Sequence, residues 1–388
     1  MKAEEIQNDG GDTMSHSLAL VQRLEALVTQ GNGSDVSLRV QIGSYPRGFS
    51  KSPVFEELLL GRNGTTLVLL ETAECAEVFD KFIRYLYCGE ISLCLEQATP
   101  LHKLATKYRV QGLQQGVTQY MTQNLASPFG HASGEWTTIS NDLLMTLLQR
   151  SDLILQSEME LITALEVWIN QNEPDALTAE NALRAVRYAM MPPRELFRLQ
   201  TQSPLLARYQ ESVRDLLYQS YQFHSASPLH MAKYFDVNCS LFMPRNYLSP
   251  AWGSPWVINN PMRDDRSTSF QTQLGPAAMT MRTMYSEHGS MQPTQVDGGQ
   301  PRIIITPATS SVDFAGVSFQ KTVVVMARQQ GNMVVRHVYN FHQSTEETGD
   351  FLVEADLHRK TSEYLVDGSL YLHIVVKPLY QTLISTKK

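Results

Sequence analysis

The chain has few of the features that mark membrane proteins, nucleic-acid-binding proteins or disulfide-stabilised domains. Only four of its 388 residues are cysteines, and they form no CxxC pair, so no disulfide framework is indicated. No apolar run approaches the length of a membrane span. The net charge is −7 and no run of Lys or Arg occurs, which argues against a surface for nucleic acid.

Catalytic signatures are missing as well. The sequence has no glycine-rich phosphate loop, no HExxH and no GxSxG elbow. An enzyme site in residues 225–300, around Trp252, Trp256, Asp264 and Asp265, is a remote alternative. The competing interpretation is that both tryptophans pack a Pro-rich segment against the β-domain that follows. We expect no catalytic residue and no cofactor.

Three residues raise the question of a metal site. Cys88 and Cys94 lie near His102 in sequence, but structural zinc sites usually present closely paired ligands. Buried, reduced thiols explain the two cysteines better, and we expect no metal. His102, His337 and His373 lie on periodic segments, where structural or surface roles are expected.

Residues 78–125 show the clearest pattern of the chain. Apolar residues at helical spacing predict a helix over 78–88, and Gly89 should end it in a left-handed cap. A short strand over 91–95, a helix over 101–108 after Pro100, and a helix over 111–125 follow. The string "Y-C-G-E-I" and then "L-x-x-L-A-x-K-Y" resembles the second half of a BTB/POZ domain, which is an assembly module.

The start of the chain fits that resemblance. Residues 16–30 predict a helix and residues 35–40 a strand, and "H-S-x-x-L-V-x-x-L" followed by "G-x-x-S-D-V-x-L" resembles the front of the longer BTB domains. In that family the first helix packs on a second subunit. The resemblance therefore implies a homodimer with Leu20, Leu24 and Leu27 in the interface. An ordinary helix packed on its own core is the alternative.

The BTB pattern is incomplete. The expected "F-x-A-H-x-x-x-L" helix is replaced by Gly43–Ser52, and further segments are expected to be missing between Leu125 and Leu143 and after Pro276. Each lost core side chain removes roughly 1.5–3 kcal/mol, and four would rival a domain's margin of about 5–15 kcal/mol. We therefore expect the BTB half to be partly truncated and unstable. A splice variant or an incomplete gene model would explain the missing segments.

The middle of the chain is predicted to be helical. Ser157 and Glu160 form a capping box ahead of an apolar helix, Pro192-Pro193 starts another helix, and a long helix should run from Pro204 to about Phe223. The string "A-V-R-Y-x-M-M-P-P" with the preceding leucine-rich helices resembles the BACK domain, which follows BTB in many adaptor proteins.

The last part reads differently. Residues 277–300 look like a flexible loop. Strands are predicted over 302–306, 317–327, 333–342 and 370–376. "S-E-Y-L-V-D-G-S-L-Y-L-H-I-V-V" resembles the end of a MATH/TRAF-like β-sandwich.

The expected class is therefore α+β, in four parts. These are a disordered lead (1–14), a partly truncated BTB/POZ domain (15–126), a BACK-like helical domain (127–224) and a C-terminal antiparallel TRAF-like β-domain (225–388).

Together the resemblances imply a non-enzymatic scaffold that binds itself and other proteins. Two cellular roles compete. The whole-chain resemblance to galectin-3-binding-protein-like members implies a secreted, oligomeric glycoprotein, for which Asn32, Asn63 and Asn238 head the sequons. Intracellular BTB–BACK proteins instead imply a cullin-3 adaptor for ubiquitination. The first residues lack the apolar core of a signal peptide, so the chain as written would be cytoplasmic.

Overall fold

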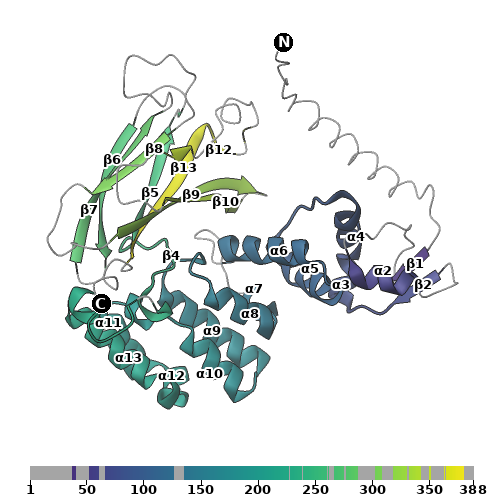
Figure 1. The fold of residues 1–388 in the computed structure, drawn as a ribbon, viewed down its shortest axis with the longest axis horizontal. Coiled ribbons are helices and arrows are strands. Elements are labelled where there is room, and N and C mark those ends of the chain that lie inside the picture. Colours follow the sequence, from purple (N-terminus) through teal and green to yellow (C-terminus); the bar gives the residue numbers. More distant parts are fainter. Residues whose placement is uncertain are drawn as a thin grey trace, which may run out of the picture. The chain divides into compact units, whose positions relative to one another are not determined.

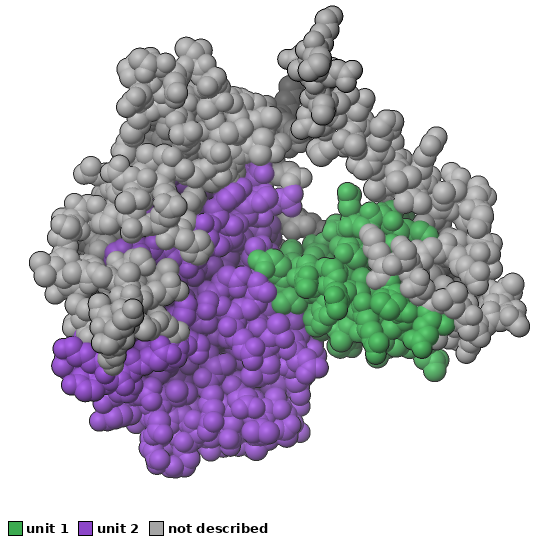
Figure 2. Space-filling view, viewed as in Figure 1, with its two compact units in different colours: residues 1–121 green, residues 122–388 purple. Residues whose placement is uncertain are grey.

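The computed structural model describes residues 37–40, 52–60, 66–125, 135–226, 228–237, 239–259, 261, 266–274, 277–286, 302–307, 318–329, 332–341, 349–350, 362 and 364–379. The chain divides into two compact units, residues 1–121 and 122–388 (Figure 2). The sequence-predicted disordered lead lies outside the described residues.

The N-terminal unit combines a two-stranded sheet with short helices (Figure 1). Its elements are β1 (Ser37–Val40), α2 (Pro53–Leu60), β2 (Thr66–Leu69), α3 (Ala73–Glu77), α4 (Phe79–Cys88), α5 (Leu95–Lys107) and α6 (Gln111–Asn124), the last of which runs past the unit boundary. β1 and β2 pair in parallel from Ser37↔Thr66 to Val40↔Leu69. Parallel neighbours need a crossover connection, and α2 lies in that connection.

Aromatic rings form the core of this unit. Phe55 of α2 is fully buried and stacks on Tyr108 with ring centroids 4.4 Å apart. Phe82 of α4 lies 5.5 Å from the same tyrosine ring. The Ser52 hydroxyl donates to the Tyr108 carbonyl at 2.6 Å. The stretch after Gly43 therefore still supplies a crossover helix with one large core side chain.

Two sequence predictions in this unit need correction. Residues 90–94 form no strand, and α5 begins at Leu95 with Pro100 inside it. A proline inside a helix costs about 3 kcal/mol, but the turn around it, from Ala98 to His102, is buried throughout. That burial stabilises the longer helix. The predicted cap at Gly89 is confirmed, with φ of 80° and its amide donating to the Tyr85 carbonyl.

The C-terminal unit begins with a helical part. Its elements are α7 (Glu135–Thr138), α8 (Asn141–Gln149), β3 (Ile154–Leu155), α9 (Glu158–Asn172), α10 (Ala176–Arg184), η1 (Tyr188–Met190), α11 (Pro193–Gln202), α12 (Pro204–Arg208), α13 (Gln210–Ser225), α14 (Pro228–Met231), η2 (Ser240–Phe242) and β4 (Asn246–Tyr247). Trp168 of α9 is fully buried, and its indole N–H donates to the Ile139 carbonyl at 2.9 Å. β4 pairs in parallel with β3, which ties the end of this part to its first helices.

Local details differ from the sequence predictions. The long helix predicted from Pro204 is broken at Tyr209, whose φ of −113° and ψ of 27° separate α12 from α13. The Ser157 hydroxyl caps α9 through the Glu160 amide, as predicted. The Glu160 carboxylate, however, accepts from the amide of Gln156 at 2.8 Å rather than completing a reciprocal box.

A β-sandwich follows. Its strands are β5 (Gly253–Asn259), β6 (Arg266–Leu274), β7 (Ala277–Ser286), β8 (Arg302–Pro307), β9 (Ser318–Gln329), β10 (Asn332–Phe341), β11 (Gly349–Asp350), β12 (Leu365–Val366) and β13 (Ser369–Leu379). One sheet has the order β11-β8-β7-β6. The other has the order β10-β9-β13-β12, with β5 also paired to β13 (Figure 1).

The prediction of a flexible loop over residues 277–300 is wrong for its first part, because 277–286 form β7. Few β-branched residues occur there, so the local signal is weak. β7 hydrogen-bonds to β6 on one side and β8 on the other. Pairing on both edges makes residues 277–286 a strand despite their weak local signal. The tendency of a residue to form a strand depends strongly on its context.

The two central strands of the five-stranded sheet, β9 and β13, are buried on both faces over most of their length. The register of β9 with β13 pairs Val323 with Ile374 on one face and Val324 with His373 on the other. All four of these residues are buried. Such double burial explains the nearly continuous apolar run in β13.

Candidate functional site

An apolar layer joins the helical part of the C-terminal unit to the five-stranded sheet. Ile154 of β3 and Leu248, which follows β4, pack in one cluster with side chains from three strands of that sheet. Those strand residues are Val324, Met326, Val335 and Val375. The helical part and the sandwich are therefore packed together, and we call this layer and the polar groups behind it the junction.

A buried ion pair lies on the helical side of the junction. Glu158 begins α9 and Arg245 precedes β4, and both side chains are fully buried. An Nη1–H of Arg245 donates to Glu158 Oε1, which also accepts from the Tyr247 hydroxyl at 2.6 Å. Glu158 Oε2 accepts from the Arg187 amide at 3.0 Å. Both carboxylate oxygens are thus engaged, as a buried charge requires.

The two arginines also bind backbone carbonyls at the ends of helices. Arg245 donates to the carbonyl groups of Leu148, Ala185 and Arg150. Arg187 donates to the Met243 carbonyl at 2.6 Å and to the Ser151 hydroxyl at 3.0 Å. Carbonyls at helix C-termini lack intrahelical partners, so these guanidinium groups satisfy them and hold α8, α10 and the segment before β4 together.

A lysine from the sandwich completes the junction. Lys377 of β13 is buried, and its Nζ donates to the Ser151 carbonyl at 3.2 Å. Burial, and then repulsion from Arg187, lowers the pKa of Lys377 to about 7. Burial, together with repulsion from Arg245, lowers the pKa of Arg187 to about 10.

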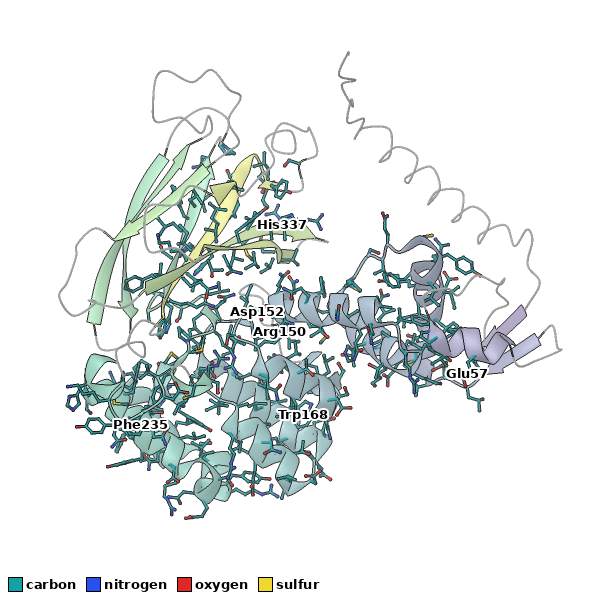
Figure 3. The ribbon with its side chains drawn as sticks, in the orientation of Figure 1. Glu57, Arg150, Asp152, Trp168, Phe235 and His337 are labelled. Carbon is teal, nitrogen blue, oxygen red and sulfur yellow. The ribbon has the colours of Figure 1, made fainter. Side chains whose placement is uncertain are left out.

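A half-exposed ion pair lies beside this lysine. Arg150 binds Asp152 through two hydrogen bonds of 2.9 and 2.6 Å, and both are labelled near the sandwich in Figure 3. Asp152 favours the charged form of Lys377.

This arrangement fixes geometry rather than performing chemistry. A lysine with a lowered pKa is a possible nucleophile, but only 3% of Lys377 is exposed. Burial keeps a substrate away from it. The charged groups bind carbonyls and carboxylates of the chain itself, so their effect is to determine how the helical part sits on the sheet.

The predicted interface and glycosylation residues cannot be compared with the structure. Leu20, Leu24 and Leu27 lie outside the described residues, as do Asn32, Asn63 and Asn238. Their roles stay predictions.

The other predicted candidates are scattered. Trp252 is buried, and its ring centroid lies 5.4 Å from that of Tyr247, which fits packing at the junction. Trp256 is half-buried on β5. Asp264 and Asp265 lie outside the described residues, so the remote enzyme hypothesis gains no support from them.

The metal candidates are also accounted for. Cys88 and Cys94 are half-buried and form no disulfide within the described residues, and His102 is buried in α5. In the part of the chain that the structure describes, no three His, Cys, Asp or Glu side chains cluster as metal ligands would. No helix within the described ranges is long and apolar enough to cross a bilayer.

The junction itself was not predicted, although one signal was present. In β13 the apolar run Leu370–Val376 indicates burial on both faces, so Lys377, next on the face of His373 and Val375, should also be buried. Nothing local marks Arg245 or Arg187, because their partners are distant in sequence.

Comparisons with known proteins agree with the order of the parts. The BTB/POZ domain model matches residues 49–125, and the BTB And C-terminal Kelch (BACK) model matches residues 98–201. The BTBD17 TRAF domain model matches residues 242–282 and 277–380.

Similar proteins span almost the whole chain. BTB/POZ domain-containing protein 17 of Homo sapiens is 50% identical over 443 residues, covering 97% of this chain and 92% of the relative. Its counterpart in Xenopus tropicalis is 46% identical over 457 residues, covering 100% and 97%. Galectin-3-binding protein of Bos taurus is 28% identical over 250 residues, covering 55% of this chain and 44% of that protein.

The aligned lengths exceed the 388 residues of this chain. The relatives therefore contain internal segments that are absent here, as the interrupted BTB pattern predicted. Identity of this degree over this length shows the family. The chain belongs to the BTB/POZ domain-containing protein 17 family.

Proposed function

We propose that this chain is a non-enzymatic scaffold that associates with itself through its BTB domain. One observation carries the proposal: BTB, BACK and TRAF-type models match successive parts of one chain. BTB domains mediate protein–protein interaction. The Glu158 carboxylate and the Nη groups of Arg187 and Arg245 are engaged with the chain itself, which supports a structural rather than a catalytic use for them.

The proposed mechanism is duplication of a binding surface. A homodimer has one two-fold axis, so two copies of the helical part and the sandwich would be displayed together. A partner with repeated sites then gains avidity without any new type of contact. The predicted contact is the helix over residues 16–30, with Leu20, Leu24 and Leu27 facing the second copy.

We further propose that the chain is a secreted-type oligomeric glycoprotein. Similarity to galectin-3-binding protein over 55% of the chain supports this. The sequons at Asn32, Asn63 and Asn238 would carry the glycans. Each lies in a sequence that an oligosaccharyltransferase can use.

Co-expression of two differently tagged copies tests the proposal. The chain is produced with a secretory leader in mammalian cells, and the medium is captured through one tag. The other tag should be recovered with it, and endoglycosidase treatment should lower the mass of both copies. Export without co-capture would contradict self-association. In a second arm the chain is expressed without an added leader; recovery from cytosol together with cullin-3 there would replace the secreted role by that of a ubiquitination adaptor.

A further inference from the structure

The outer face of β13 carries a histidine in the apolar layer of the junction. His373 is 9% exposed, and its neighbours on the same face are Tyr371 and Val375, both in the junction cluster. Val324 of β9 lies opposite it, and Pro255 of β5 lies on its other side. Its neighbours in the sheet are thus apolar, and of them Pro255 is itself exposed.

One nitrogen of this ring has no hydrogen-bond partner. His373 Nε2 is buried and accepts or donates no bond within the described part of the chain. The space beside it is closed by β5, because a Cβ placed on Gly253 would lie 3.2 Å from Nε2. An imidazolium needs acceptors for both N–H groups. Protonation here would therefore bury an unsatisfied charged donor.

We propose that His373 makes the junction acid-labile, so that protonation of its imidazole favours separation of the helical part from the five-stranded sheet. This inference does not depend on the proposed scaffold function. Its basis is that the ring lies on the face of the sheet that carries Val324 and Val375, which pack against Ile154 and Leu248 of the helical part. Opening the junction would expose Nε2 to water, whereas in the closed form this nitrogen is buried without a partner.

The charged groups around the junction do not relieve that cost. Lys377 lies on the same face of β13, and the neighbouring helical part contributes Asp152 and Arg187. The residues paired with His373 on β9 and β5 are uncharged. Burial is accordingly the cause that lowers the pKa of His373 to about 4.

The size of the effect follows from linkage. In an opened junction the ring would regain a pKa near 6.5, whereas the closed form keeps about 4. Between pH 7 and pH 5 the opened form binds more protons, so the opening equilibrium should rise ~20-fold. Lys377 adds about twofold at most in this window, because the closed form has lost half of its proton at pH 7 and both forms carry it at lower pH.

Native-state hydrogen exchange tests the proposal on the full chain. The probe is the amide of Val376 in β13, which donates to the carbonyl of Trp252 in the segment that leads from the helical part into the sandwich. Corrected for intrinsic chemistry, its exchange should rise at least ~20-fold from pH 7 to pH 5. Amides in the interior of α9 should not follow. In His373→Leu the rise should fall to about twofold or less, which is the part that Lys377 contributes.

His224→Leu is the matched control. His224 is half-buried and also has a buried, unpartnered Nε2, but it lies on α13. Its loss should leave the acid response of the junction intact. His373→Gln provides a second uncharged variant if His373→Leu does not fold.

Three results would overturn the proposal. These are a rise of ~20-fold that persists in both His373 variants, no rise in the wild type, or an equal rise throughout α9, which would mean global unfolding. If neither variant folds, NMR titration of the His373 imidazole in the wild-type chain takes the place of the variants. A His373 resonance that titrates near pH 6.5 without faster exchange at the junction would also overturn it.

Discussion

Arg245 and Glu158 form an ion pair whose two side chains are both fully buried, although 87 residues separate them in sequence. Burying one charge away from water costs several kcal/mol, roughly, whereas a buried pair of opposite charges offsets much of that cost. The pair therefore makes the segment before β4 dependent on the start of α9. This relationship links the helical part to the connection that leads into the sandwich.

Removing one partner of this pair should destabilise the folded chain strongly. Arg245→Met leaves the Glu158 carboxylate buried without its cation, and we expect a loss of roughly 3–5 kcal/mol in the free energy of unfolding. Tryptophan fluorescence during urea unfolding measures it. All four tryptophans lie in the C-terminal unit, so the signal reports on that unit alone.

An exposed pair supplies the control for that experiment. Arg214 contacts Glu211 at 2.7 Å, with 61% and 79% of the side chains exposed. Arg214→Met should therefore cost only about 0–1 kcal/mol. Equal losses in the two variants would show that burial of the Arg245 pair has no special weight.

Gly253 should not tolerate a side chain. A Cβ at this position would lie 2.2 Å from the Ile374 carbonyl oxygen, which belongs to the backbone of β13 and cannot turn aside. We expect Gly253→Ala to destabilise the sandwich by about 1–3 kcal/mol, as overpacking does. Calorimetric unfolding measures the change.

Gly116 offers the opposite case. It lies inside α6, and a Cβ there would meet nothing within 4 Å. Gly116→Ala should stabilise its unit by roughly 0.5–1 kcal/mol, since alanine favours the helix. A stabilising Gly253→Ala would refute the close approach of β5 to β13.

Lys377 should make stability depend on pH. Its folded pKa of about 7 lies below its ordinary value of 10.5. The unfolded chain therefore binds more protons between those values, and stability rises with pH across that window. Lys377→Met should raise the free energy of unfolding by about 1–4 kcal/mol at pH 7. The gain over wild type should shrink toward pH 10, as measured by urea unfolding at both pH values. A constant gain would mean that the lysine is not neutralised in the folded chain.

Regular elements were largely predictable from the sequence, and the junction was not. Runs of β-branched residues predict β9, β10 and β13. An apolar stripe followed by Gly89 predicts α4. Their signals are local, because side-chain spacing alone decides which face is buried.

The errors arose where distant partners decide the outcome. β7 forms because β6 and β8 pair with both of its edges, and α5 passes through Pro100 because that turn is buried. The Glu158–Arg245 pair depends on the fold bringing α9 and the segment before β4 together. No spacing rule connects residues so far apart.

Self-association should depend on the apolar stripe predicted over residues 16–30. Leu24→Asp places a charge on that stripe and should weaken the dimer strongly, because an unpaired carboxylate would be buried in the contact. Gln22→Asp adds the same charge off the stripe and should leave the dimer unchanged. Dilution series by analytical ultracentrifugation measure both dissociation constants. Equal weakening by both variants would indicate a general charge effect instead.

The most direct test of the scaffold account is the mass of the full chain in solution. Sedimentation equilibrium at micromolar concentration should give at least twice the 43.8 kDa of one chain. A monodisperse species at 43.8 kDa would contradict the account, because a single copy cannot display its binding surfaces in pairs.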